Sequence, residues 1–215
     1  MRGAHIFLVA LAAMAASSAQ AAVVCTVIAD ARDGQVLLSE GDCETRVTPA
    51  STFKIALAAM GYDSGLLADA HSPVLAFRPG DSDWGGEAWR RPTDPTAWMR
   101  HSVVWYSKRI AQGLGVERLR DYGRRFAYGN ADFSGDPGKD NALERAWISS
   151  SLTISPREQT LFLRELITGR LPISRDAAAK TVAIVESGGS SDGWRISGKT
   201  GSAYPRKADG SLDRA

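Results

Sequence analysis

Cysteine and histidine are scarce in this chain, which has only two cysteines and three histidines in 215 residues. Structural zinc sites take four cysteine, histidine or carboxylate ligands, and catalytic zinc sites commonly take three protein ligands. Nothing in the sequence resembles a His-x-His ligand cluster, so we expect no metal centre. One histidine, His5, falls in an N-terminal leader, which leaves only His71 and His101 and disfavours a histidine-based catalytic triad.

The chain also lacks an excess of charge of either sign, and apart from its first residues it lacks long apolar runs. Twenty-six basic and 24 acidic residues give a net charge of +2. This balance gives no reason to expect a nucleic-acid partner or binding to a charged membrane surface. No run after the leader approaches the ~18 apolar residues of a membrane-spanning helix. We therefore expect a protein without a membrane anchor.

Residues 1–21 have the features of a cleavable secretory signal. A polar start containing Arg2 is followed by an apolar stretch, Ile6–Ala16, and then by Ala19-Gln20-Ala21. A basic start, a short apolar region and an Ala-x-Ala site are typical of such signals. The alternative is a buried N-terminal helix, but no other feature of the chain requires one. We predict export and cleavage after Ala21.

The two cysteines flank a predicted β-hairpin. The β-prone runs Val23–Ala29 and Gln35–Ser39 are separated by Asp33-Gly34, a strong hairpin signal. Folding there places Cys25 opposite residues 42 and 43. Export favours oxidation, so we predict a Cys25–Cys43 disulfide; two separate thiols remain the alternative.

The order of predicted elements indicates an α+β fold in one domain, residues 22–215. Strands come first, a long helical middle follows, and a strand returns near the end. A sheet part of about 22–60 and 188–215 would be split by a helical part of about 61–187. Predicted helices cover 51–60, 102–114, 116–126, a segment starting at Ser155 and residues 175–187. Ser155-Pro156-Arg157-Glu158 is a capped helix start.

Ser51 and Lys54 are the strongest candidates for chemistry. Residues three apart on a helix share a face, with Cβ atoms about 5–6 Å apart. Ser51 would lie at the helix start, where free N–H groups favour developing negative charge. Lys54 sits among apolar residues, and burial would favour its neutral amine, which can act as a base. A plain N-cap serine and a solvated lysine would be the expectation for this spacing alone.

Further short signals follow Ser51-Thr52-Phe53-Lys54 in order. They are Ser102-Val103-Val104, Tyr128-Gly129-Asn130, Trp147 with Leu152 to Gln159, and Lys199-Thr200-Gly201. Taken singly, the Tyr128 and Lys199 motifs are better explained as turns and Trp147 as a core anchor. Ser-x-Val is so loose a pattern that Ser72-Pro73-Val74 matches it as well. A Gly-x-Ser-x-Gly match at 189–193 has a predicted helix before it and a strand after it. A hydrolase elbow needs the reverse order, so we interpret this match as a flexible connector.

Together these motifs resemble the class D (oxacillinase-type) β-lactamases over essentially the whole mature chain. The matching segments are Pro49–Lys54, Ser102–Tyr106, Tyr128–Asn130, Trp147–Gln159 and Lys199–Gly201. The resemblance implies the serine β-lactamase and penicillin-binding transpeptidase-like fold, and hydrolysis of β-lactam antibiotics in the periplasm of a Gram-negative-type bacterium. It implies β-lactams as small-molecule partners, no bound cofactor, and a need for CO2 or bicarbonate; a homodimer is left open.

The resemblance also implies a role for each site residue. Ser51 would form the acyl-enzyme. Lys54 would become N6-carboxylysine and act as the general base. Ser102 would relay a proton to the lactam nitrogen, Val104 would keep the lysine pocket dry, and Trp147 would donate its indole N–H to the carbamate. Lys199, Thr200 and Gly201 would line the substrate side, and the backbone N–H groups of Ser51 and Ser202 would form the oxyanion hole.

Two further expectations follow from the resemblance. A penicillin-binding sensor or transpeptidase that is acylated without turnover is the rival function. The family has additional strands and a C-terminal helix after Lys-Thr-Gly, including an arginine that pairs with the substrate carboxylate, whereas this sequence ends at Ala215. We therefore expect a partial sequence, and we expect the 215-residue chain itself to be inactive. Substrate spectrum is not readable from the motifs.

Overall fold

The computed structural model describes residues 23–185, 187–204 and 211–212. The predicted signal peptide, residues 1–21, and its cleavage site lie outside the described residues. The helices in the described part are α1 (Phe53–Asp63), α2 (Pro95–His101), α3 (Val104–Leu114), α4 (Val116–Arg125), α5 (Ala142–Arg145), α6 (Pro156–Ile167) and α7 (Arg175–Ile184), with 3-10 turns η1 (Ala50–Thr52) and η2 (Glu87–Arg90). No helix among these residues is long and apolar enough to cross a membrane.

The N-terminal hairpin forms as predicted. Strands β1 (Cys25–Ala29) and β2 (Val36–Gly41) pair antiparallel, with Cys25 opposite Gly41 and a register shift after Ile28. The shift moves the pairing by one or two residues from the symmetric hairpin expected from Asp33-Gly34. The Cys25–Cys43 disulfide closes the end of the hairpin, with Cα atoms 5.1 Å apart. Both cysteines are therefore oxidised, and the alternative of two free thiols is excluded.

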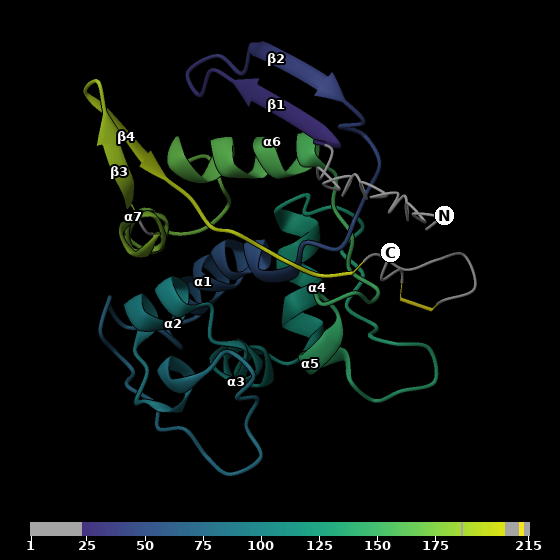
Figure 1. Cartoon of the computed structure of the whole chain (residues 1–215), viewed down its shortest axis with the longest axis vertical. Coiled ribbons are helices and arrows are strands. Elements are labelled where there is room, and N and C mark those ends of the chain that lie inside the picture. The colour runs from purple at the N-terminus through teal and green to yellow at the C-terminus, as the bar shows by residue number, and fades with distance from the viewer. Residues whose placement is uncertain (1–22, 186, 205–210, 213–215) are drawn as a thin grey trace, which may run out of the picture.

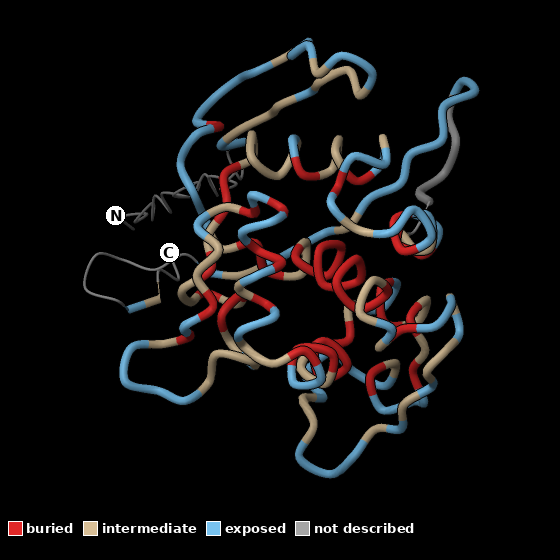
Figure 2. The backbone as a smooth tube through the Cα atoms, turned by 180° about the vertical axis from the view of Figure 1, so that it is seen from behind, coloured by how far each residue is buried: buried red, intermediate tan, exposed pale blue. Residues whose placement is uncertain are grey.

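Helix α1 lies at the centre of the molecule, and ten of its 11 residues are buried. It is apolar on all sides, as expected of a helix surrounded by other elements. It packs against α3 on one side and α7 on another. In Figure 2, burial is concentrated in the central helices, whereas β2 is mostly exposed and β1 is mostly half-buried. The core therefore surrounds the helix that carries Lys54.

Helix α6 begins at the predicted capping box. The Ser155 hydroxyl accepts the Glu158 N–H at 3.2 Å, and the Glu158 carboxylate accepts the Ser155 N–H at 2.9 Å. These bonds satisfy two of the N–H groups that a helix start leaves unpaired. The helix packs against β1 and α7, and Figure 1 shows it lying beneath the hairpin.

The segment interpreted as a flexible connector is instead part of a second hairpin. Strand β3 (Ser187–Ser191) pairs antiparallel with β4 (Trp194–Ser197), and Asp192-Gly193 forms the turn between them. The predicted helix at 175–187 ends earlier, at Ile184. Glycine and serine do not pack well in strands, so the sequence signal for β3 was weak. Among the described strands, the two hairpins form separate two-stranded sheets rather than the single split sheet we predicted.

Candidate active site

The nucleophile candidate lies on a short turn and not in the first turn of an α-helix as predicted. Ser51 is in η1, and α1 begins at Phe53. Ala50 before it has φ 49°, a left-handed conformation that costs energy for a residue with a Cβ atom. The Thr52 hydroxyl donates to the Pro49 carbonyl at 2.7 Å and steadies this turn. The turn thus holds Ser51 half-buried at the start of the central helix.

Ser51 and Lys54 are in direct contact. The Lys54 Nζ atom lies 3.0 Å from Ser51 Oγ and forms a hydrogen bond with it. Lys54 is only 1% exposed, because α1 is enclosed by other helices. Burial, with a smaller contribution from the Lys199 ammonium, lowers the pKa of Lys54 to about 7. Near neutral pH a large fraction of this amine is therefore unprotonated and able to accept a proton from Ser51.

Aromatic packing fixes Trp147 beside the helix that carries Lys54. Phe53 is fully buried, and its ring lies 5.4 Å from the Trp147 ring in a stacked arrangement. Tyr128 and Phe133 pack against the same Phe53 ring, each at 5.7 Å. Trp147 is 1% exposed. The Trp147 indole is thus packed in the core next to α1, the helix that carries Lys54. The sequence analysis expected this indole to donate a hydrogen bond to the modified Lys54.

The Lys199-Thr200-Gly201 segment crosses the start of α1 (Figure 1). A Cβ atom added at Gly201 would lie 3.0 Å from the Pro49 carbonyl oxygen and 3.1 Å from the Ser51 nitrogen. A glycine lets this backbone approach the nucleophile turn closely. The Lys199 Nζ atom donates to the Thr200 carbonyl at 2.9 Å, and the charge of its ammonium contributes to the lowered pKa of Lys54. Thr200 and Ser202 are exposed on this segment.

The Ser102-Val103-Val104 motif forms the junction between two helices. Ser102 ends α2 with φ 58°, again in the left-handed region, and Val104 begins α3. Both valines are buried, and α3 packs against α1. Within the described part of the chain, the Ser102 side chain makes no hydrogen bond to Ser51 or Lys54. The fold thus packs the motif's helix against α1 without linking its hydroxyl to the Ser51–Lys54 pair.

The Tyr128-Gly129-Asn130 motif, to which we assigned no role, shapes the segment that follows Trp147. The Asn130 side chain donates to the Ser151 carbonyl at 2.8 Å and accepts the Thr153 N–H at 3.0 Å. Gly129 has φ 56°, and a Cβ there would lie 1.9 Å from the Thr153 carbonyl oxygen. Only glycine fits this approach. Spacing alone could not reveal the contact, because the two segments are more than 20 residues apart.

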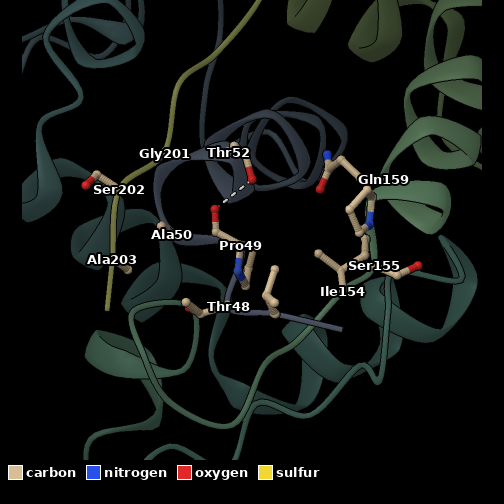
Figure 3. Close-up of a pocket in the computed structure, with 12 residues that line it drawn as sticks. Thr48, Pro49, Ala50, Thr52, Ile154, Ser155, Gln159, Gly201, Ser202 and Ala203 are labelled. Carbon is tan, nitrogen blue, oxygen red and sulfur yellow. Dashed lines mark hydrogen bonds between the residues drawn. The ribbon is translucent and has the colours of Figure 1, made fainter. Parts of the chain in front are cut away.

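A cavity in the described part of the chain borders this site without containing its reactive groups. It has a volume of about 810 Å³ and is lined on one side by Gly201, Ser202 and Ala203 and on another by Thr52 and Gln159. Figure 3 shows the Gln159 amide facing the start of α1 across the cavity. Ala50 and Thr52 line it, but Ser51 and Lys54 do not. We therefore place the reacting centre by the Ser51–Lys54 contact and not by this cavity.

The sequence did not indicate the contact that the Gln159 side chain makes beside this cavity. It accepts a hydrogen bond from the Tyr128 hydroxyl at 3.0 Å, and its own Nε2 atom is buried without a partner. Burial raises the pKa of Tyr128, so this hydroxyl stays a donor.

Among the residues that the structure describes, no group of three or more histidine, cysteine or carboxylate side chains could hold a metal ion.

Comparison with protein families finds one extended match. Residues 24–214 match the family described as penicillin binding protein transpeptidase domain. The match includes every predicted site residue, from Ser51 to Ser202.

Curated relatives and solved structures agree with this match. The chain is 40% identical to β-lactamase OXA-9 of Klebsiella pneumoniae over 191 residues, which cover 89% of this chain and 70% of that protein. It is 37% identical to β-lactamase OXA-1 of Escherichia coli, covering 77% of this chain and 59% of that protein. The crystal structure of the class D β-lactamase OXA-427 superimposes with a TM-score of 0.83 at 49% identity, covering 88% of this chain and 77% of that one.

Proposed function

We propose that this chain, which belongs to the penicillin-binding protein transpeptidase domain family and within it to the class D β-lactamases, hydrolyses β-lactam antibiotics through an acyl-enzyme on Ser51. The observation that carries the proposal is the 3.0 Å contact between Ser51 Oγ and the buried amine of Lys54. A half-buried serine that contacts a buried lysine of lowered pKa is an arrangement suited to nucleophilic catalysis, because the lysine amine can accept the serine proton. The family membership supplies the substrate class.

Acylation begins with attack of Ser51 Oγ on the lactam carbonyl carbon. The Ser51 proton passes to the base at Lys54, and the carbonyl oxygen becomes an oxyanion held by the backbone N–H groups of Ser51 and Ser202. The carbon–nitrogen bond of the lactam then breaks, and Ser102 relays the proton taken up at Lys54 to the departing nitrogen, which leaves the base free for deacylation. The close approach of Gly201 to the Ser51 nitrogen supports this pairing of donors, because it brings the Ser202 segment beside the nucleophile.

Deacylation requires a base for water, and we propose that Lys54 fills this role as its carbamate. The neutral amine adds CO2 and releases one proton, which yields an N-carboxylate anion on Nζ. The pKa of about 7 supports this step, since an amine must be unprotonated to react. The anion would need a hydrogen-bond donor in an apolar pocket. Trp147 would supply it from the indole packed on Phe53, and the buried Val104 would exclude water.

The rival function is acylation without turnover, as in a penicillin-binding sensor or transpeptidase. The description of the matching family gives this alternative its support. Mass spectrometry after mixing with benzylpenicillin distinguishes the two. A β-lactamase shows a transient adduct on Ser51 that decays to free enzyme and hydrolysed product, and Ser51→Ala shows none. A stable adduct would favour the rival, and an adduct on Ser51→Ala would refute the site.

Labelled bicarbonate tests the lysine chemistry separately. We expect a 13C carbamate signal that is absent from Lys54→Ala, and faster deacylation when bicarbonate is added to degassed enzyme. Fast turnover without any labelled carbamate would show that Lys54 acts as a free amine.

We propose that the 215-residue chain hydrolyses β-lactams far more slowly than its longer relatives, because the chain spans 70% of OXA-9 and segment 198–204 belongs to neither described sheet. Nitrocefin hydrolysis at the rate of OXA-9 would refute this. We also propose export to the periplasm, which the Cys25–Cys43 disulfide supports. Intact mass of exported protein, expected to begin at Ala22, tests it.

A further inference from the structure

One threonine hydroxyl joins the nucleophile segment to the Trp147 segment. Thr48, three residues before Ser51, donates from Oγ1 to the Trp147 carbonyl at 3.0 Å. The same Oγ1 atom accepts the N–H of Ser149 at 2.9 Å. A single side chain therefore satisfies backbone groups on both sides of Ile148. Valine could fill the same space but could make neither bond.

One serine hydroxyl extends this connection to the Lys-Thr-Gly segment. Ser149 Oγ donates to the Tyr204 carbonyl at 2.6 Å, across 55 residues of sequence. Ser149 is 5% exposed and adopts φ 51°, a left-handed conformation that a non-glycine residue adopts at a cost. This conformation lets its N–H face Thr48 while its hydroxyl reaches Tyr204. Tyr204 lies two residues after Ser202, whose N–H we assign to the oxyanion hole.

We propose that Thr48 and Ser149 are positioning residues that hold the three parts of the active site in register. We use the name hydroxyl clamp for three hydrogen bonds. Two join Thr48 Oγ1 to the Trp147 carbonyl and the Ser149 N–H, and the third joins Ser149 Oγ to the Tyr204 carbonyl. One end of the clamp is the chain leading into Ser51, its middle carries Trp147, and its far end holds the extended segment that carries Ser202. The effects on acylation and deacylation rest on the proposed function, hydrolysis through a Ser51 acyl-enzyme. Neither hydroxyl is assigned to contact the substrate.

The two halves of the clamp act on different chemical steps. Loss of the Thr48 hydroxyl frees the Trp147 backbone, so the indole is less well placed for the Lys54 carbamate, and deacylation slows. Loss of the Ser149 hydroxyl frees the Ser202–Tyr204 segment, so an oxyanion donor moves, and acylation slows. Losing such a donor outright costs about 100-fold or more in rate. A displaced donor should cost less, about tenfold.

The experiment compares Thr48→Val and Ser149→Ala with matched controls in the 215-residue chain. Thr48→Ser keeps the hydroxyl at the first position. Ser150→Ala removes a neighbouring hydroxyl that bonds to Asp136 and not to the clamp. Formation and decay of the penicillin adduct are followed by intact mass, with and without bicarbonate. Hydrogen exchange of the amides at 202–204 is measured in parallel and needs no activity.

The clamp predicts a split between the variants. Thr48→Val should slow adduct decay about tenfold, with partial rescue by bicarbonate and full rescue in Thr48→Ser. Ser149→Ala should slow adduct formation about tenfold and raise exchange at 202–204, whereas Ser150→Ala should do neither. Equal losses of both steps in both variants, or unchanged exchange in Ser149→Ala, would overturn the proposal. If the unaltered chain forms no adduct, that agrees with the low activity we propose for these 215 residues, and exchange at 202–204 alone then decides whether the clamp exists: unchanged exchange in Ser149→Ala overturns it.

Discussion

Replacing Lys54 with methionine should make the protein more stable, and more so at low pH. Methionine has a similar length and fills the same apolar space without a charge. The amine it replaces is 1% exposed, and burial lowers its pKa from 10.5 to about 7. Protonating this group inside the folded protein is therefore costly, because the ammonium loses its hydration. The penalty disappears in the variant.

The size and sign of the effect follow from the two pKa values. Each pKa unit corresponds to about 1.4 kcal/mol, so a shift from 10.5 to about 7 is equivalent to about 5 kcal/mol when Lys54 is fully protonated. Between pH 7 and 10.5 the unfolded chain binds more protons at this group than the folded chain. The unfolding free energy contributed by Lys54 must therefore rise with pH across this window. We expect the advantage of the variant to shrink from about 5 kcal/mol at pH 6 to about 1.5 kcal/mol at pH 9.5.

Urea unfolding at several pH values, followed by tryptophan fluorescence, measures this difference. Buffers are kept free of bicarbonate so that the amine is not carboxylated. The same substitution at Lys180, which pairs with Asp176 on the surface of α7, controls for the loss of a cation. Parallel stability curves for wild type and Lys54→Met from pH 6 to 9.5 would refute the reasoning, because the amine would then not be desolvated in the folded state.

Three other predictions address separate parts of the structure. The double variant Cys25→Ser with Cys43→Ser should lose about 3 kcal/mol of stability in urea unfolding, since the disulfide closes a loop of 18 residues; an unchanged midpoint would contradict this. Ser155→Ala should lose about 1 kcal/mol in the same assay, because it removes the N-cap of α6; no change would mean that the cap does not matter. Gly201→Ala should slow acylation of Ser51 about tenfold, equal to about 1.4 kcal/mol, because the new Cβ would press on the turn that carries Ser51; normal adduct formation would show that the 199–201 segment can move without consequence.

Local geometry made several features predictable from the sequence. The three-residue spacing of Ser51 and Lys54 brought their side chains to one face, and the structure joins them at 3.0 Å. Hairpin pairing across Asp33-Gly34 indicated the disulfide within one or two residues of the observed register. The capping box at Ser155 depends on four consecutive residues. In each case the interacting groups are close in sequence, so backbone geometry alone brings them together. The motif combination, from Pro49 to Gly201, also gave the family.

The second hairpin was not predictable in this way. Its first strand consists of glycine and serine, which carry no apolar alternation, and it was interpreted as a connector. The separation of the two described hairpins into two sheets was likewise missed. Sheet pairing depends on which distant strand edges meet, and a chain's local pattern does not contain that information.

The sequence by itself determined the family, the pairing of Ser51 with Lys54, and the local structures that hold the disulfide and α6. The tertiary structure alone decided how basic that lysine is, because its desolvation depends on the helices that enclose α1 and on Lys199 far along the chain. It also decided that Gly201 touches the Ser51 turn and that Ser149 reaches Tyr204. These contacts join segments 55 to 150 residues apart, and only packing of the whole core brings such segments within hydrogen-bonding distance.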